Sequence, residues 1–283
     1  EDDMTHDNYR PASYVKFNAG LGADGLPTAV TATVACPAFG PTGQNGVDGN
    51  AVDGIYNAPY KFAALKVDAH HPDTGVPCTY WRSVGYSQNT YFMESFVDEM
   101  AAAAGQDPVE YRRKLLNSPR ALAVLNLAAE KADWGKALPA GRARGVAVVN
   151  NIGSFNAVVA EVSAAGGKLK VHRVVCAVDC GVVVNPEILR AQMESGVVYG
   201  LTTLKTAITI NKGRVVETNF HQYEPLRIDD MPKVEVHVVP STAAPGGIGE
   251  ASTPTIVPAV TNAIASLTKK RVRALPVKAA DLA

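Results

Sequence analysis

The chain has 283 residues, of which 47% are hydrophobic and 19% are charged, a composition typical of a folded protein with one or two domains and not of a disordered one. Basic and acidic residues number 27 each, so the net charge is zero, which argues against a general nucleic-acid binder. No apolar run approaches the length needed to span a bilayer. The N-terminal Glu1-Asp2-Asp3-Met4 resembles neither a translation start nor a signal peptide, so we expect an internal piece of a longer protein.

The first 80 residues predict strands interrupted by one long loop. Residues 12–35 are typical of a hairpin that turns at Asp24-Gly25. Residues 37–54 contain two prolines and five glycines, and a loop of this length in a compact domain is often functional. A further strand is expected over Phe62–Val67.

Helices are expected to crowd residues 90–132. The first has an apolar stripe at helical spacing and ends at Gly105. A second begins at Asp107-Pro108 and runs through Leu116, because aspartate and proline are favoured at a helix start. A third helix follows it.

Strands resume at Val146, and strands and helices then alternate without regular spacing. The elements that we expect are strands over 157–163 and 168–178, a helix opening at Asn185-Pro186, a hairpin turning at 211–213 and a strand over 234–239. Because the order does not repeat a strand–helix–strand unit, we predict an α+β fold with mixed sheets and packed helices.

Cysteines and histidines give no metal-binding pattern. Cys176 and Cys180 lie four residues apart in a predicted strand, which separates them by roughly 13 Å, too far for a disulfide. The spacings typical of zinc and iron–sulfur ligands are absent, so we predict no metal held by protein side chains. We expect the adjacent His70-His71 at a strand end, without a metal role.

A glycine-rich stretch, residues 245–254, follows the last predicted strand. Its glycines Gly246, Gly247 and Gly249 allow the backbone to turn sharply and to lie against a bulky ligand, and Glu250 comes next. A phosphate-binding loop would require Lys-Ser/Thr at this point, so a nucleotide site is disfavoured.

We expect a helix to begin just after Glu250. Thr253 or Thr255 is a suitable cap, and Pro254 and Pro258 suit a first turn. Glu250 would then lie at the positive end of the helix dipole, where an ionised carboxylate is favoured. Residues 245–254 alone nevertheless favour an ordinary turn with a solvated glutamate over a poised base.

Longer motifs along the whole chain add to this stretch. They are Tyr9-Arg10-Pro11, Trp81-Arg82-Ser83-Val84-Gly85, Val175 to Gly181 with Asn185-Pro186, Gln192-Met193-Glu194-Ser195-Gly196 and Gly246-Gly247-Ile248-Gly249-Glu250. In this order they resemble the molybdenum hydroxylases, the family of xanthine dehydrogenase and aldehyde oxidase. The resemblance is greatest to the beta subunit of isoquinoline 1-oxidoreductase and the large subunit of bacterial aldehyde dehydrogenases.

The resemblance implies a molybdopterin-binding-domain type of fold. Residues 1–80 would end the first cofactor-binding region, and residues 81–283 would form the second molybdopterin-binding domain, which carries the catalytic glutamate. The implied cofactor is molybdopterin with molybdenum, in bacteria usually the cytosine dinucleotide form. The pterin holds the metal, which agrees with the absence of protein ligands.

The resemblance also implies site residues. Glu250 would act as general base on a molybdenum-bound hydroxide that attacks the substrate carbon. Arg82 would lie near the molybdenum and orient substrate or cofactor, and a surface ion pair is the alternative. The cofactor-binding candidates are Gly246, Gly247, Gly249, Gln192, Ser83 and Gly85. For Gln192, a solvated position at a helix start is the alternative.

One family feature is missing, an upstream Gly-Gly-Gly-Phe-Gly loop that wraps the cofactor. We therefore expect a companion chain that carries this N-terminal part of the large subunit. The resemblance further implies [2Fe-2S] clusters on a small subunit, with a cytochrome as a further candidate acceptor, and favours the bacterial periplasm over the cytoplasm. It leaves the substrate open between an aldehyde and an N-heterocycle. The alternative function is a non-catalytic homologue or assembly fragment of such an enzyme.

Overall fold

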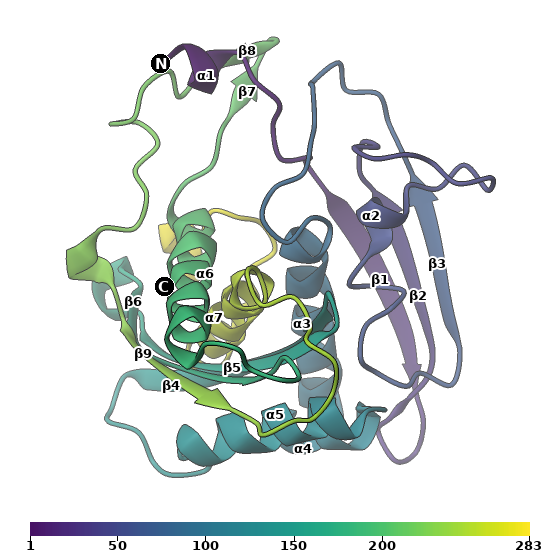
Figure 1. Cartoon of the computed structure of the whole chain (residues 1–283), viewed down its shortest axis with the longest axis vertical. Coiled ribbons are helices and arrows are strands. Elements are labelled where there is room, and N and C mark those ends of the chain that lie inside the picture. Colours follow the sequence, from purple (N-terminus) through teal and green to yellow (C-terminus); the bar gives the residue numbers. More distant parts are fainter.

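The computed structural model describes residues 1–283, and its first sheet contains the strands of the N-terminal part (Figure 1). The sheet has the order β1-β2-β3, with β1 at Tyr14–Leu21, β2 at Pro27–Ala35 and β3 at Leu65–His70. β1 and β2 form the predicted antiparallel hairpin, and Gly25 at its turn has φ 77°. β3 runs parallel to β2.

The predicted position of β3 was wrong by three residues. Phe62 precedes the strand because the backbone before it pairs with another element: Lys61 N–H donates to the Leu115 carbonyl at 2.8 Å. The sheet pairing starts only at Leu65, opposite Val30. His70 ends the strand, as expected.

The long loop before β3 closes around one buried carboxylate. Asp48 caps the short helix α2 (Gly49–Val52) by accepting from Asn50 N–H, and it also accepts from the N–H groups of Phe39 and Gly40, each at 2.9 Å. A loop with few large apolar side chains is thus held by polar bonds to a single residue.

Three helices follow in the predicted region. They are α3 at Tyr86–Ala103, α4 at Pro108–Leu115 and α5 at Pro119–Lys131. Asp107 caps α4 as predicted, through bonds to Val109 and Glu110 N–H. α3 stands between the two larger sheets, and Figure 1 shows it beside β1 on one side and near β4 and α7 on the other.

The second sheet forms the centre of the molecule. Its order is β4-β5-β6-β9, with β4 at Arg142–Asn151, β5 at Ser154–Ser163, β6 at Lys170–Asp179 and β9 at Lys233–Val238. The first three strands are antiparallel, and β9 is parallel to β6. The mixed sheets confirm the α+β prediction.

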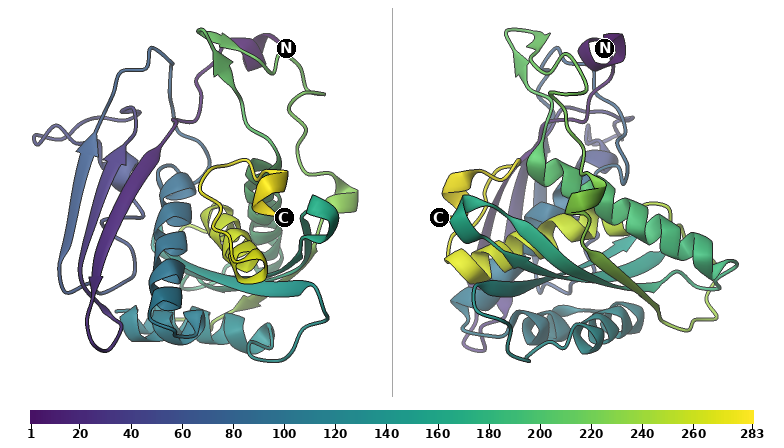
Figure 2. Two further views of the ribbon diagram at one scale, coloured as in Figure 1. Left: turned by 180° about the vertical axis from the view of Figure 1, so that it is seen from behind. Right: turned by 90° about the vertical axis from the view of Figure 1, so that its left-hand side faces the viewer.

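Helices cover both faces of this sheet. α6 (Pro186–Lys205) and α7 (Ser252–Thr268) pack on one face, and α5 lies on the other (Figures 1 and 2). The remaining elements are small: α1 at Asp2–Thr5, the predicted hairpin of β7 (Ile210–Asn211) and β8 (Arg214–Val215), and 3-10 turns at Ala165–Gly167, Ile228–Asp230 and Ala279–Asp281. No helix is both long and apolar enough to cross a membrane.

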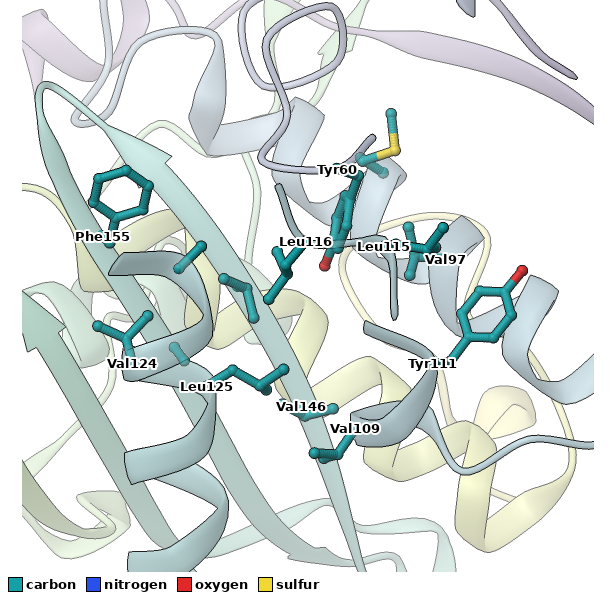
Figure 3. Packing of buried hydrophobic residues seen from close by; sticks show 14 of the residues in the cluster. Tyr60, Val97, Val109, Tyr111, Leu115, Leu116, Val124, Leu125, Val146 and Phe155 are labelled. Atoms are coloured by element: carbon teal, nitrogen blue, oxygen red, sulfur yellow. The ribbon is translucent and has the colours of Figure 1, made fainter. Parts of the chain in front are cut away.

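Two hydrophobic clusters form the core, one on each side of the second sheet. The first joins β2, α3, α4, α5 and one face of the sheet, and Figure 3 shows Val97, Val109, Leu125 and Val146 within it. The second lies between the other face and the helices α6 and α7. α7 is buried on all sides from Ser252 to Ala265, because it lies between the sheet, α3 and α6.

Candidate functional site

The glycine-rich stretch lies against the turn between β4 and β5. Gly246 N–H donates to the Cys180 carbonyl and Gly247 N–H to the Ile152 carbonyl, each at 2.8 Å. A Cβ on Gly246 would lie 2.7 Å from the Gly153 backbone, and one on Gly247 would lie 2.7 Å from the Ile152 side chain. These two glycines therefore allow a close contact within the chain, and their N–H groups are already used there.

Gly249 differs from the other two glycines. A Cβ at this position would have only one neighbour within 4 Å, the Gln192 side-chain oxygen at 3.9 Å. Its φ lies outside the left-handed region that only glycine favours. The chain itself therefore does not require glycine here, and open space remains above the residue for a ligand.

Arg82 connects the stretch to α6. Its Nε donates to the Gly249 carbonyl at 2.9 Å, and its two terminal nitrogens donate to Ser195 Oγ at 2.9 Å and to Gln192 Oε1 at 3.1 Å. No carboxylate pairs with Arg82, so the alternative of a surface ion pair does not apply. The guanidinium holds the backbone of the residue that precedes Glu250.

The turn that carries Arg82 is strained. Ser83 and Val84 have φ of 77° and 48°, in the left-handed region that costs side-chain-bearing residues about 1–3 kcal/mol each. Ser83 is buried, and its hydroxyl donates to the Glu250 carbonyl at 3.0 Å. Gly85 permits a close approach to α2, since a Cβ there would lie 1.7 Å from the Asn50 carbonyl oxygen. Both residues thus act on the site by holding backbone in place.

Glu250 directly precedes Ala251, the first residue before α7. One of its carboxylate oxygens is buried and has no hydrogen-bond partner in the chain. An orphaned acceptor of this kind is rare in folded proteins and is commonly satisfied by a ligand or a water. The predicted place of Glu250 at the positive end of a helix is confirmed.

The predicted caps of α7 were wrong. Neither Thr253 nor Thr255 caps it, because Thr255 Oγ1 donates back to the Ala251 carbonyl and Thr253 Oγ1 has no partner. Ser252 Oγ donates instead across to the Met193 carbonyl of α6 at 2.8 Å. Pro254 lies in the first turn as expected, whereas Pro258 lies further inside the helix.

α6 presents one face to this site. Gln192, Ser195 and Tyr199 follow helical spacing, and all three contact Arg82. On the side toward α7, a Cβ at Gly196 would lie 2.1 Å from Ser252 Oγ, so glycine is needed for the close packing of the two helices. Ser195 and Tyr199 were missed as site residues in the sequence, although their spacing from Gln192 was the available signal.

An ion pair between a partly exposed arginine and a buried carboxylate fixes the far side of the glycine-rich stretch. Arg120 of α5 donates to both carboxylate oxygens of Asp179, at 2.8 and 2.7 Å, and to the Gly153 carbonyl at 3.3 Å. This bidentate contact holds the pKa of Asp179 below its ordinary value. The end of β6 and the turn under Gly246 are thereby tied to one another.

Two models of known protein families match this chain. A family model described as a molybdopterin cofactor-binding domain matches residues 89–232, and a second model of the same description matches residues 1–116. The first covers more than half of the chain. The chain belongs to the family of molybdopterin cofactor-binding domains.

Similar proteins agree with this family assignment. The beta subunit of isoquinoline 1-oxidoreductase from Brevundimonas diminuta is 34% identical over 99% of this chain and 38% of its own length. The membrane-bound aldehyde dehydrogenase (pyrroloquinoline-quinone) from Gluconacetobacter polyoxogenes is 30% identical over 99% of this chain and 41% of its own length. The chain therefore spans about two fifths of the length of these curated relatives.

The fold is shared with solved structures of much lower identity. Quinoline 2-oxidoreductase from Pseudomonas putida 86 superposes with a TM-score of 0.83 at 12% identity, over 99% of this chain and 62% of that one. Aldehyde oxidoreductase from Desulfovibrio desulfuricans superposes with a TM-score of 0.77 at 13% identity, over 99% of this chain and 49% of that one. The whole chain thus takes the fold of the matching part of these two proteins.

Proposed function

We propose that this chain supplies the catalytic base and one wall of the cofactor cleft of a molybdenum hydroxylase that oxidises an aldehyde or an N-heterocycle. The proposal rests on one observation: the backbone of Glu250 is held in place, while its carboxylate is free to accept a proton. Its carbonyl accepts from Ser83, its neighbour Gly249 is held by Arg82, and a buried carboxylate oxygen has no partner. Because these bonds hold its backbone, Glu250 is already in position to accept a proton.

The residues at the site suit a molybdopterin. Gln192 and Arg82 offer polar groups at the edge of the stretch, and the open face of Gly249 leaves space for a flat ligand. When bound, the cofactor would supply the two-electron oxidation and activate the water whose oxygen enters the product. Glu250 would accept the proton released in this step, and Arg82 would keep Gly249 and Glu250 in register.

Gly246 and Gly247 would support this cofactor wall indirectly, since both N–H groups bond within the chain. Ser83 and Gly85 would do so through the turn that carries Arg82. Electrons would leave through [2Fe-2S] clusters on a partner chain and pass from there to an acceptor such as a cytochrome. A second companion would carry the N-terminal part of the large subunit, and the cofactor would have the cytosine dinucleotide form.

The pyrroloquinoline-quinone in the name of one relative indicates a different cofactor for that protein. Both family models that match this chain describe molybdopterin binding, so we favour molybdopterin here. The alternative of a non-catalytic homologue predicts an assembly without molybdenum. Metal analysis of the purified assembly separates these possibilities.

The test is Glu250→Gln in the complete assembly. Glutamine keeps the size of the side chain but cannot accept a proton at neutral pH, so kcat should fall by roughly 10²–10⁴-fold with unchanged molybdenum content. Glu187→Gln on the exposed start of α6 is the matched control and should keep wild-type turnover. A Glu250→Gln assembly that turns over within a few-fold of wild type would refute the role of Glu250.

A further inference from the structure

Four side chains stack in a column that ends at the glycine-rich stretch. The Arg10 guanidinium lies 4.6 Å from the centre of the Trp81 ring. Trp81 stacks on Tyr199 with ring centres 4.7 Å apart and an interplanar angle of 26°. The Arg82 guanidinium lies 5.5 Å from the centre of the same Tyr199 ring. We call these four residues the aromatic column.

The Arg10 side chain lies over Trp81 and is also close to Tyr223 and Tyr199. It takes part in none of the ion pairs and none of the side-chain hydrogen bonds of the chain. Burial lowers its pKa to about 10, so it is still charged at neutral pH. A partly desolvated guanidinium over an indole ring contributes up to about 2 kcal/mol, more than at an exposed site. The Arg10 guanidinium thus restricts the orientation of the Trp81 ring by lying over its face.

Tyr199 is the centre of the aromatic column. Trp81 and Arg82 are adjacent in the chain, and both contact the Tyr199 ring. The turn that carries them therefore contacts this side chain of α6 at two points. No hydrogen bond is made by the Tyr199 hydroxyl, which leaves the ring itself as the contacting part. Contacts with Tyr199 stabilise the turn at Ser83 and Val84, whose positive φ angles are unfavourable for residues with side chains.

The hydrogen bonds of Arg82 are half exposed and therefore weak by themselves. Its partner Ser195 lies at the surface, and solvent competes for such bonds. Stacking on Tyr199 restricts the rotamers of Arg82 and so favours the geometry in which its Nε reaches the Gly249 carbonyl.

We propose that Arg10, Trp81 and Tyr199 are positioning residues, which fix Arg82 and, through the Gly249 carbonyl, the place of Glu250. None of the three makes a hydrogen bond or an ion pair with Glu250, so they act through Arg82. The kinetic consequence rests on the proposed function, whereas the coupling of the aromatic column to residues 245–251 rests on the geometry alone. The N-terminal segment around Arg10 thereby becomes part of the site.

The first experiment measures this coupling in the 283-residue protein without cofactor. Trp81 and Trp134 are its only tryptophans, so Trp134→Phe leaves Trp81 as the sole indole reporter. In that background, Tyr199→Leu should shift Trp81 emission to longer wavelength and increase quenching by acrylamide. Backbone hydrogen exchange in the peptide 245–252 should become faster. Tyr199→Phe keeps the ring and should restore both values.

The second experiment measures kinetics in the complete assembly. Tyr199→Leu should lower kcat by about 10- to 100-fold with unchanged KM and molybdenum content, because a misplaced base slows the chemical step. Tyr199→Phe should recover wild-type kcat. Tyr14→Leu, which removes an equally large ring that is 69% exposed on β1, is the matched control and should change neither kcat nor exchange in residues 245–252.

The outcomes separate the two proposals. Wild-type kcat in Tyr199→Leu, or failure of Tyr199→Phe to rescue, overturns the positioning role and leaves the role of Glu250 intact. An assembly without molybdenum-dependent turnover refutes the proposed function, and hydrogen exchange then decides whether the coupling exists. If Tyr199→Leu does not fold, Arg10→Gln replaces it: faster exchange in residues 245–252, restored by Arg10→Lys, supports the column, and unchanged exchange overturns it.

Discussion

At the residue scale, three glycines that look alike in sequence have different physical roles. Gly246 and Gly247 leave no space for a Cβ because their neighbours are the backbone and side chains of the β4–β5 turn. Gly249 has open space beside it and donates no backbone bond within the chain. The first two glycines therefore serve packing, and only the third is free to serve a ligand.

This difference predicts opposite effects of valine. Gly249→Val should change the free energy of unfolding by no more than about 0.5 kcal/mol, because the chain offers space for the side chain. It should nevertheless reduce the molybdenum content of the assembly, since valine fills the space that a cofactor needs. Gly246→Val should destabilise the chain itself by about 1–3 kcal/mol through overpacking. Urea denaturation and metal analysis measure the two effects.

Full cofactor loading in the Gly249→Val assembly would contradict a ligand at this face. Equal stability of the two variants would show that the contacts of Gly246 relax at no cost. The pair of substitutions thus separates a binding glycine from a packing glycine, although the two lie three residues apart in the same stretch.

At the element scale, β9 joins the sheet through charge as well as backbone bonding. Glu235 of β9 accepts from Arg173 of β6 at 3.0 and 2.8 Å, and Lys233 lies 2.8 Å from the same carboxylate. The hydrogen bonds from Arg173 lower the pKa of Glu235 from 4.5 to about 2. β9 delivers the chain to the glycine-rich stretch, so this pair also helps to place the site.

A lowered carboxyl pKa has a defined consequence for stability. The ionised form of Glu235 is favoured in the folded state, so its contribution is fully present above pH 4.5 and is lost as the pH falls toward about 2. Glu235→Gln should lower the free energy of unfolding at pH 7 by on the order of 1–2 kcal/mol, after allowance for solvent screening. The difference from wild type should shrink through this acid window.

Urea denaturation at a series of pH values between 7 and 3 measures this difference. Glu224→Gln is the control, because that carboxylate is exposed and pairs only with Arg227. A stability difference for Glu235→Gln that stays constant with pH would show that the ion pair does not stabilise the β6–β9 contact.

At the scale of the whole molecule, a buried ionic network joins elements from distant parts of the sequence. Glu94 of α3 accepts from Arg112 of α4 at 2.9 Å and from Val148 N–H of β4 at 3.0 Å, and it also bonds Tyr60. Arg271 near the C-terminus reaches Asp98 of α3 at 2.6 Å. The attraction of Glu94 outweighs burial and raises the pKa of Arg112 above its ordinary value.

Removal of one partner from this network should be costly. Arg112→Met leaves Glu94 as an uncompensated buried charge, so the free energy of unfolding should fall by about 3–5 kcal/mol. Arg113→Met on the same helix removes an arginine whose side chain is 35% exposed, and it should cost less than about 1 kcal/mol. Chemical denaturation of both variants tests the contrast, and equal losses would contradict it.

The same network bears on the predicted boundary at residue 80. Tyr60 and Glu94 lie on opposite sides of that boundary yet bond directly, and the first hydrophobic cluster also contains residues from both sides. The two family models overlap over residues 89–116. A division into residues 1–80 and 81–283 stays a prediction, and the packing argues for cooperative unfolding of both parts.

The sequence by itself determined most of the elements and the approximate place of Glu250, although β3 begins three residues later than predicted and the full extent of β4 was not predicted. Turn pairs such as Asp24-Gly25, the Asp107-Pro108 and Asn185-Pro186 helix starts, and the alternation of apolar residues act over a few residues, so local physics fixes them. The position of Glu250 before a helix followed from the same local signals. The resemblance to the molybdenum hydroxylases came from the order of longer motifs.

Only the tertiary structure decided which of these residues meet. Arg82, Ser195 and Gly249 are far apart in the chain, and their contact depends on the close packing of α6 on α7 at Gly196. Thr255 bonds the Ala251 carbonyl instead of capping the helix, and the Thr253 hydroxyl is buried without a partner. A single sequence does not show which distant residues come into contact. Their contact is favourable only once the surfaces that carry them pack together and exclude water.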